Sequence, residues 1–333
     1  MFHVKHPFAS STAANAANEG GQALSKEGRR EVRRAMGRQS RFVFVYTLIF
    51  TLAGYALALA LEAAGFAGAS TFFSDHLGEM SIAGLAAGML FVLLKLRGRF
   101  LPSLRRADPE PHRMNARMLG TFLLLLVGAQ AVFSVITLCL GALADALGYR
   151  VFSTMDSLDA AAPTVWMILY AGVLAPIVEE IVFRGVVLGA LAKFGQTFAI
   201  VASAVLFGLF HGDFAQGGFA FCTGIVLGFA ATRYSLGWAI GLHIFNNLVL
   251  SDWLGQLVGL LPELGQSIFA ELFFLTGILG TVWVLGRNRD GIKRWLAAHR
   301  APAKTALAAF TAPSFLLFAA LQTALSVMAF APL

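Results

Sequence analysis

The chain has 333 residues, of which 58% are hydrophobic and only 13% are charged. Soluble domains use about 25% charged residues, so this composition excludes an ordinary soluble protein and indicates a membrane protein. The net charge of +7 does not indicate a nucleic-acid partner, because the basic residues lie in loops between apolar segments instead of on one soluble face.

Runs of about 20 apolar residues can cross a hydrocarbon core of about 30 Å as helices, since each residue adds about 1.5 Å. The sequence contains nine such runs. They are residues 42–66, 77–96, 118–144, 164–192, 197–212, 217–233, 235–253, 265–286 and 307–331. We therefore predict an all-α fold, a polytopic transmembrane helix bundle with eight to nine spanning helices and no long internal repeat.

Composition divides the chain into four parts. We predict a polar and basic cytoplasmic tail, then a first group of transmembrane helices with a basic cytoplasmic loop. A core of apolar helices that contain charged and polar residues follows, and then a last group of transmembrane helices. Their bounds are 1–40, 41–146, 164–253 and 265–333.

The basic residues predict the orientation. Placing the N-terminus in the cytoplasm and alternating over nine spans puts 23 of the 25 Lys and Arg residues in cytoplasmic segments, as the positive-inside rule requires. This predicts an external C-terminus. The basic stretch 25–41 is either a helix on anionic headgroups or a solvated tail, and we favour the tail because blocks of like charge are often tails.

Small side chains within the apolar runs indicate packing. Cys139 and Cys222 are predicted to be buried, free thiols and not a disulfide or a metal site. Glycines four residues apart allow helices to approach closely. The pairs are Gly84 with Gly88, Gly185 with Gly189, Gly224 with Gly228, and Gly237 with Gly241.

Three charged residues interrupt the apolar run 164–192. An ionisable residue inside a span costs about 2.5 to 3.5 kcal/mol, so it normally faces a protein interior or a water-filled cavity. Glu180 and Arg184 are four residues apart on one helix face and can form an ion pair. Glu179 points about 100° away, and a desolvated carboxylate left unpaired there is suited to accept a proton. Pro176, just upstream, can kink the helix and make room for water.

Three further polar residues lie at a similar depth. His211 ends the run 197–212, while His243 and Asn247 are four residues apart in the run 235–253. Counting about 1.5 Å per residue from the nearest cytoplasmic boundary places Glu179 and these three residues about 14 to 21 Å deep, near mid-membrane. We expect them to meet, and a histidine with an amide can hold a water or stabilise an oxyanion.

Each of these residues also has a simpler interpretation. His211 alone could be a packing residue, the Glu180 and Arg184 pair could only lock helices together, and Asn246 and Asn247 could be interhelical hydrogen-bonding groups. A proton- or solute-coupled transporter also uses such residues, but it should show repeated halves, and none is visible. A proteolytically silent scaffold remains a third alternative. Their common depth favours catalysis.

Written as patterns, these segments are EExxxR (Glu179, Glu180, Arg184), FxxxH (Phe207, His211) and HxxxN (His243, Asn247). In this order they resemble the signature motifs of the CAAX protease and bacteriocin-processing (CPBP) family, which includes the CAAX prenyl endopeptidases. The resemblance covers about a quarter of the chain, roughly 167–250, so the region 164–253 is expected to be the catalytic core of an intramembrane endopeptidase.

The resemblance implies a role for each motif residue. Glu179 would activate the hydrolytic water with help from His211, His243 and Asn247 would stabilise the oxyanion, and Glu180 and Arg184 would support them. Because the family is described as metalloproteases, Glu179, His211 and His243 could also supply three ligands to a metal such as zinc, although HExxH is absent and a glutamate-dependent mechanism needs no ion. The expected partners are the lipid bilayer and a peptide or protein substrate that could be lipidated.

Overall fold

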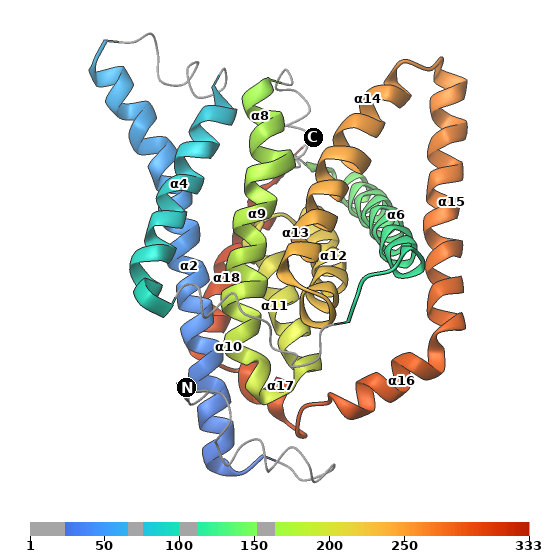
Figure 1. Ribbon diagram of the computed structural model, residues 1–333. Helices are drawn as coiled ribbons and strands as arrows, with labels where there is room; N and C mark the ends of the chain where they lie inside the picture. Colours follow the sequence, from blue (N-terminus) through green and yellow to red (C-terminus); the bar gives the residue numbers. More distant parts are fainter. Residues whose placement is uncertain (1–23, 66–75, 100–111, 152–163, 333) are drawn as a thin grey trace, which may run out of the picture.

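A computed structural model describes residues 24–65, 76–99, 112–151 and 164–332 (Figure 1). The remaining parts of the predicted N-terminal tail and of the basic loop, together with residues 66–75, 152–163 and 333, lie outside the described residues. The first helices are α2 (Lys26–Ala63), α4 (Leu77–Leu96), a 3-10 turn (Arg97–Arg99) and α6 (Ala116–Ala146). The last helices are α15 (Glu263–Arg287), α16 (Arg289–Ala298), α17 (Thr305–Phe310) and α18 (Pro313–Met328).

The central helices alternate between α and π geometry. One continuous rod consists of α8 (Val165–Leu169), π-helix η2 (Tyr170–Leu174), α9 (Ala175–Glu180), π-helix η3 (Ile181–Leu188), α10 (Gly189–Leu191) and a 3-10 turn (Ala192–Phe194). After it come α11 (Gln196–Phe210) and α12 (Phe214–Arg233). A second rod consists of α13 (Leu236–Ile244), π-helix η5 (Phe245–Trp253) and α14 (Leu254–Gly259).

The all-α polytopic architecture is confirmed. Six helices in the described part of the chain are long and apolar enough to cross a membrane, and α11 and α18 are shorter apolar helices. The predicted run 307–331 is not one helix, because Pro313, which lacks an N–H and cannot continue a helix from before it, starts α18 after the end of α17. A total of eight to nine spans stays a prediction.

The basic stretch 25–41 differs from the solvated tail that we favoured. Helix α2 starts at Lys26 and continues without a break into the apolar run. Val32 and Met36 are fully buried, in a core that also contains Ala308 and Ala309 of α17. Apolar residues one helical turn apart give this basic helix a buried stripe, which the charge pattern had concealed.

Two small elements were not predicted. The amphipathic helix α16 occupies part of the expected cytoplasmic loop, and two three-residue strands form an antiparallel ladder, β1 (Tyr149–Val151) with β2 (Phe330–Pro332). The ladder ties the end of α6 to the end of the chain.

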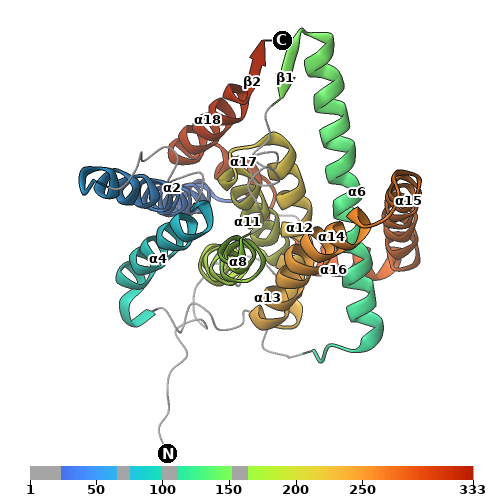
Figure 2. The same ribbon diagram turned by 90° about the horizontal axis from the view of Figure 1, so that it is seen from above.

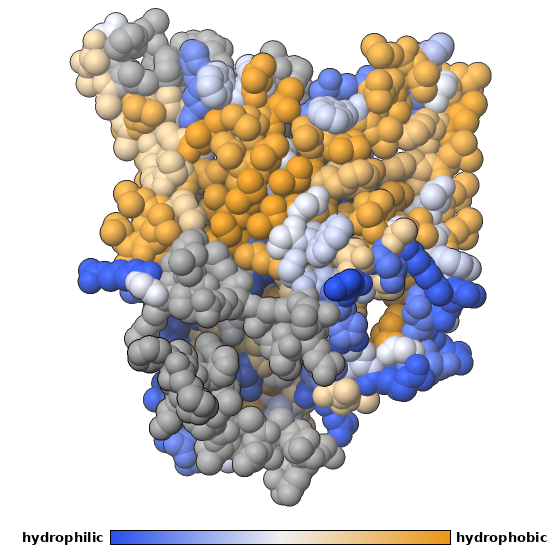
Figure 3. All heavy atoms as spheres, in the orientation of Figure 1, coloured by the Kyte–Doolittle hydropathy of each residue, from blue (hydrophilic) through white to orange (hydrophobic). Residues whose placement is uncertain are grey.

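The charged core of the protein lies at the centre of the bundle. Figure 2 shows α8, α11, α12 and α13 in the middle, with α2, α4 and α18 on one side and α6 and α15 on the other. Apolar residues cover most of the upper part of the face in Figure 3, while hydrophilic residues gather around α16 near the lower rim. The central helices therefore have other helices packed on two sides.

Glycines set several of the helix contacts. A Cβ on Gly84 would lie 2.5 Å from the Phe50 carbonyl oxygen, and one on Gly224 would lie 3.0 Å from Ala204, so close packing is confirmed at these sites. It is wrong for Gly241, which has open space around it. A further contact, between α6 and α15, was missed: a Cβ on Gly128 would lie 1.9 Å from Oγ1 of Thr281.

The prediction of buried cysteines is wrong. Cys139 is exposed and Cys222 is partly exposed, and both are free thiols. Their apolar neighbours misled the prediction, because in a membrane protein an apolar helix face can point outward toward lipid as well as inward.

Candidate active site

Wide helical turns flank both glutamates of the EExxxR motif. Glu179 and Glu180 end α9, which lies between the π-helices η2 and η3. Pro176 lies at the start of α9, where its missing N–H cannot donate to the preceding turn. Single π turns inside α-helices are frequent at functional sites. The local backbone therefore departs from α geometry on either side of the two carboxylates.

Glu180 binds two partners with one oxygen. Its Oε1 lies 2.9 Å from Nη1 of Arg184 and 2.9 Å from Nδ1 of His243. The predicted pairing of Glu180 with Arg184 is confirmed, and the bond to His243 adds a link from α9 to α13. Glu180 is 0% exposed. A carboxylate only accepts hydrogen bonds, so the proton of this contact lies on His243 Nδ1.

Glu179 has a different environment. Its Oε2 lies 3.7 Å from His243 Nε2, a distance that is longer than a hydrogen bond. The residue is 9% exposed, against 0% for Glu180. The two neighbouring glutamates thus face the same imidazole, Glu180 at one nitrogen and Glu179 near the other, and only Glu179 retains some accessibility.

Phe207 connects the two histidines. Its ring centroid lies 4.9 Å from that of His211 and 5.8 Å from that of His243, and the Arg184 guanidinium lies 4.4 Å from the ring centroid. The first position of the FxxxH motif therefore packs between the charged pair and the imidazoles, and the cation over its face is stabilised by the aromatic quadrupole.

His211 has a defined tautomer. Its Nδ1 lies 2.9 Å from the carbonyl oxygen of Phe207. Because a carbonyl only accepts, Nδ1 carries the hydrogen, and in the neutral ring Nε2 is left as an acceptor.

Asn247 does not contact the glutamates directly. Its Nδ2 donates to the carbonyl oxygen of Ala171 (3.0 Å), and its Oδ1 accepts from Nδ2 of Asn246 (3.0 Å). The π-helix η5 begins at Phe245, between His243 and Asn247 in the chain. A hydrogen-bonded Oδ1 fixes the orientation of the Asn247 amide and leaves its second N–H available.

Sequence reasoning missed several polar neighbours. Gln130 of α6 donates to Oδ1 of Asn246 (3.3 Å) and to Ser251 (3.0 Å), and the hydroxyls of Tyr46 and Tyr170 feel the charge of Glu179. Gln130 lies alone in an apolar run, and the tyrosines look like ordinary core aromatics. Only the isolated glutamine offered a signal, because an uncharged polar side chain inside a span also needs a partner.

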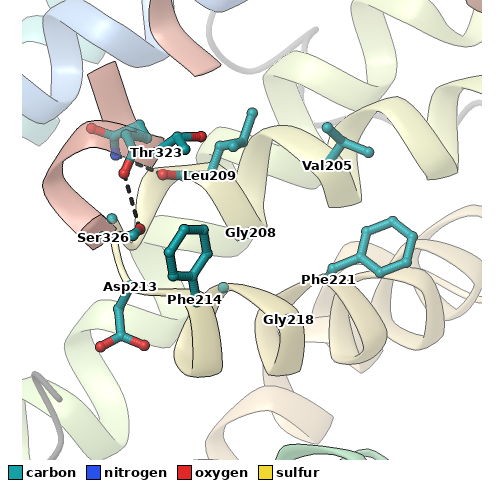
Figure 4. Close-up of a pocket in the computed structure, with 12 residues that line it drawn as sticks. Val205, Gly208, Leu209, Asp213, Phe214, Gly218, Phe221, Thr323 and Ser326 are labelled. Carbon is teal, nitrogen blue, oxygen red and sulfur yellow. Dashed lines mark hydrogen bonds between the residues drawn. The ribbon is translucent and has the colours of Figure 1, made fainter. Parts of the chain in front are cut away.

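A small cavity adjoins the segment that carries His211. It has a volume of about 230 Å³ and lies between α11, α12 and α18. Figure 4 shows Phe214 and Phe221 of α12 facing the side of α11 that carries Val205 and Leu209. Gln322 of α18 donates to the carbonyl oxygens of Leu209 and Phe210, which anchors the end of α11 just before His211.

The proposed metal ligands do not form a three-ligand cluster. In the part of the chain that the structure describes, no group of three or more His, Cys, Asp and Glu side chains is arranged to hold a metal ion. The Nδ1 atoms of His243 and His211 are hydrogen-bonded to Glu180 and to a backbone carbonyl, so only their Nε2 atoms are open to a further ligand. No step below involves a metal.

The fold and the site together define an integral membrane protein with a charged, histidine-containing site at the centre of its apolar helices. Residues 161–249 match the protein family described as "Type II CAAX prenyl endopeptidase Rce1-like". The match contains all three motifs and confirms the resemblance to the CPBP family of CAAX proteases. It supports a protease in a membrane. Neither the curated proteins nor the solved structures give a match.

The geometry predicts that the two glutamates differ in their effect on stability. Glu180→Gln keeps the shape but removes the counter-charge of buried Arg184, and breaking a buried pair typically costs about 3 to 5 kcal/mol. We expect the thermal midpoint of the purified protein to fall by several degrees, on the order of 5 °C or more. The matched control Glu179→Gln should shift it little. Equal losses for the two variants would contradict the assigned partners.

Proposed function

We propose that this protein is an intramembrane endopeptidase that hydrolyses a peptide bond of a membrane-associated protein or peptide. The family match supports a membrane protease. The observation that carries the mechanism is the difference between the two glutamates. Arg184 and His243 bind Glu180, whereas Glu179 keeps a partly accessible carboxylate beside His243 Nε2.

In this proposal Glu179 is the general base. It takes a proton from water, the resulting hydroxide attacks the carbonyl carbon of the peptide bond, and the proton later passes to the leaving amine when the C–N bond breaks. His211 assists by accepting a hydrogen bond from the water at Nε2, the nitrogen that its bond to Phe207 leaves free. Positioned bases of this kind contribute about 10²- to 10⁴-fold in rate.

His243 and Asn247 are the proposed oxyanion donors. Since Nδ1 of His243 donates to Glu180, His243 would donate to the oxyanion from Nε2, which requires a hydrogen on both ring nitrogens. Asn247 contributes the N–H that its bond to Ala171 leaves over. Each such donor is worth about 10²- to 10³-fold in kcat.

We also propose that the substrate belongs to the class of membrane-associated, lipidated peptides. The matched family is described as a "CAAX prenyl endopeptidase", and a site among apolar helices suits a substrate that is held at the membrane. A lipidated peptide is therefore the first substrate to test, with an unmodified peptide of the same sequence beside it.

Cleavage by the reconstituted protein tests the mechanism. With a fluorescence-quenched farnesylated CAAX peptide as the reporter, we expect Glu179→Gln to lower kcat by at least about 10²-fold, with His211→Ala also impaired. Full cleavage by Glu179→Gln would sink the proposed base. Activity lost to a chelator and restored by stoichiometric zinc would instead show that the metal-free mechanism is wrong.

We also propose that the N-terminus is cytoplasmic and the C-terminus external. Helix α2 starts at the lower side of Figure 1 and the chain ends at the upper side, and the basic residues of α2 and α16 lie at the lower side, as the positive-inside rule requires of a cytoplasmic face. Topology reporters fused to the two ends should report opposite compartments. Reports from the same compartment would contradict this orientation.

A further inference from the structure

A second cavity lies far from the charged site, between the start of α2 and α17. It has a volume of about 560 Å³. Five basic side chains line it together with Leu307, Ala308 and Thr311; they are Lys26, Arg29, Arg30, Arg33 and Lys304. Among the residues that the structure describes, no acidic residue lines the cavity. The proposed catalysis uses none of these residues.

Helix geometry and one unusual turn bring the cations together. Lys26, Arg30 and Arg33 are spaced by four and three residues, so they follow one face of α2, while Val32 and Met36 on another face are buried in the core. From the opposite wall comes Lys304, whose φ of 69° lies in the left-handed region that non-glycine residues rarely adopt. The cluster is thus fixed by two separate segments.

The nearby acidic residues leave this charge largely uncompensated. Glu31 faces away, since its carboxylate binds Lys193 at 2.5 Å, and Glu27 is not among the lining residues. Arg33 donates to the Thr311 hydroxyl (3.1 Å) and Arg29 to the Leu24 carbonyl (2.6 Å), so both guanidiniums are positioned by neutral groups. Like charges gathered around one cavity repel, and an anion relieves that repulsion.

The cavity lies at the level where the apolar segments end. The Glu31 to Lys193 ion pair places this part of α2 beside the end of the central rod, and the apolar segment that starts near Leu307 begins here as well. Leu307 itself is 64% exposed. A basic cavity with an exposed apolar wall at the membrane boundary has the features of a lipid headgroup site.

We propose that this cavity binds the phosphate of an anionic membrane phospholipid. The arginines donate hydrogen bonds to the phosphate oxygens, and an acyl chain extends from the cavity along Leu307. Arginine suits this role because its planar guanidinium can bind two phosphate oxygens at once. A free inorganic phosphate shares the headgroup chemistry, but it would gain nothing from the exposed apolar wall. An anionic phospholipid is therefore the ligand that matches both the basic wall and the apolar wall of the cavity.

Lipid retention by the full-length protein tests this proposal. The protein is purified in detergent, offered phosphatidylglycerol and phosphatidylcholine, and analysed by native mass spectrometry. The wild type should retain one phosphatidylglycerol at least tenfold more strongly than phosphatidylcholine. Arg30→Gln combined with Lys304→Asn should lower that preference about tenfold, and asparagine at 304 tolerates the left-handed backbone.

A matched control distinguishes a specific lipid site from general electrostatic attraction to the basic part of α2. Arg34→Gln with Arg38→Gln removes the same charge from α2, but neither residue lines the cavity, so the preference should stay within twofold of wild type. An equal loss in both double variants would overturn the proposal. No preference in the wild type, or displacement of the lipid by millimolar inorganic phosphate, would overturn it as well, and these two outcomes do not depend on how any variant folds.

Discussion

The site depends on one carboxylate oxygen. Oε1 of Glu180 lies 2.9 Å from both Arg184 and His243, and all three residues are buried in the middle of the bundle. A charge in such a place is tolerated only with a partner. Because Arg184 neutralises Glu180 and His243 is held by it, the pair joins α9 to α13 and fixes the imidazole that faces Glu179. The division of labour between two neighbouring glutamates follows from this contact.

Backbone geometry makes the contact possible. The π turns around α9 and at the start of η5 shift side chains by one residue relative to an α-helix. At Gly172 a Cβ would lie 2.9 Å from Leu248, so the absence of a side chain lets η2 and η5 approach closely. That approach brings Asn247 within reach of the Ala171 carbonyl.

The sequence predicted which residues belong to the site better than it predicted the contacts between them. Charges inside an apolar run are so costly that Glu179, Glu180 and Arg184 could only belong to an interior site, and α-helical spacing correctly paired the last two. The hydrogen bonds of Asn247 to Ala171 and Asn246 were not predicted, because nothing in the sequence reveals the π-helix η5 in which Asn247 lies. Gln130 could not be linked to the site either, since its partner Asn246 is 116 residues away. In the fold, long apolar runs were recognised well, but the buried stripe of the basic part of α2 was hidden by its charge.

The central claim is that Glu180 accepts a hydrogen bond from Nδ1 of His243 and leaves Nε2 facing Glu179. Nitrogen-15 solid-state NMR of the bilayer-reconstituted protein with ring-labelled histidine measures this directly, with the His243 signals assigned by their loss in His243→Gln. The account predicts a protonated Nδ1 in the wild type. A neutral His243 ring with its only hydrogen on Nε2 would contradict it, because Glu180 would then have no hydrogen to accept.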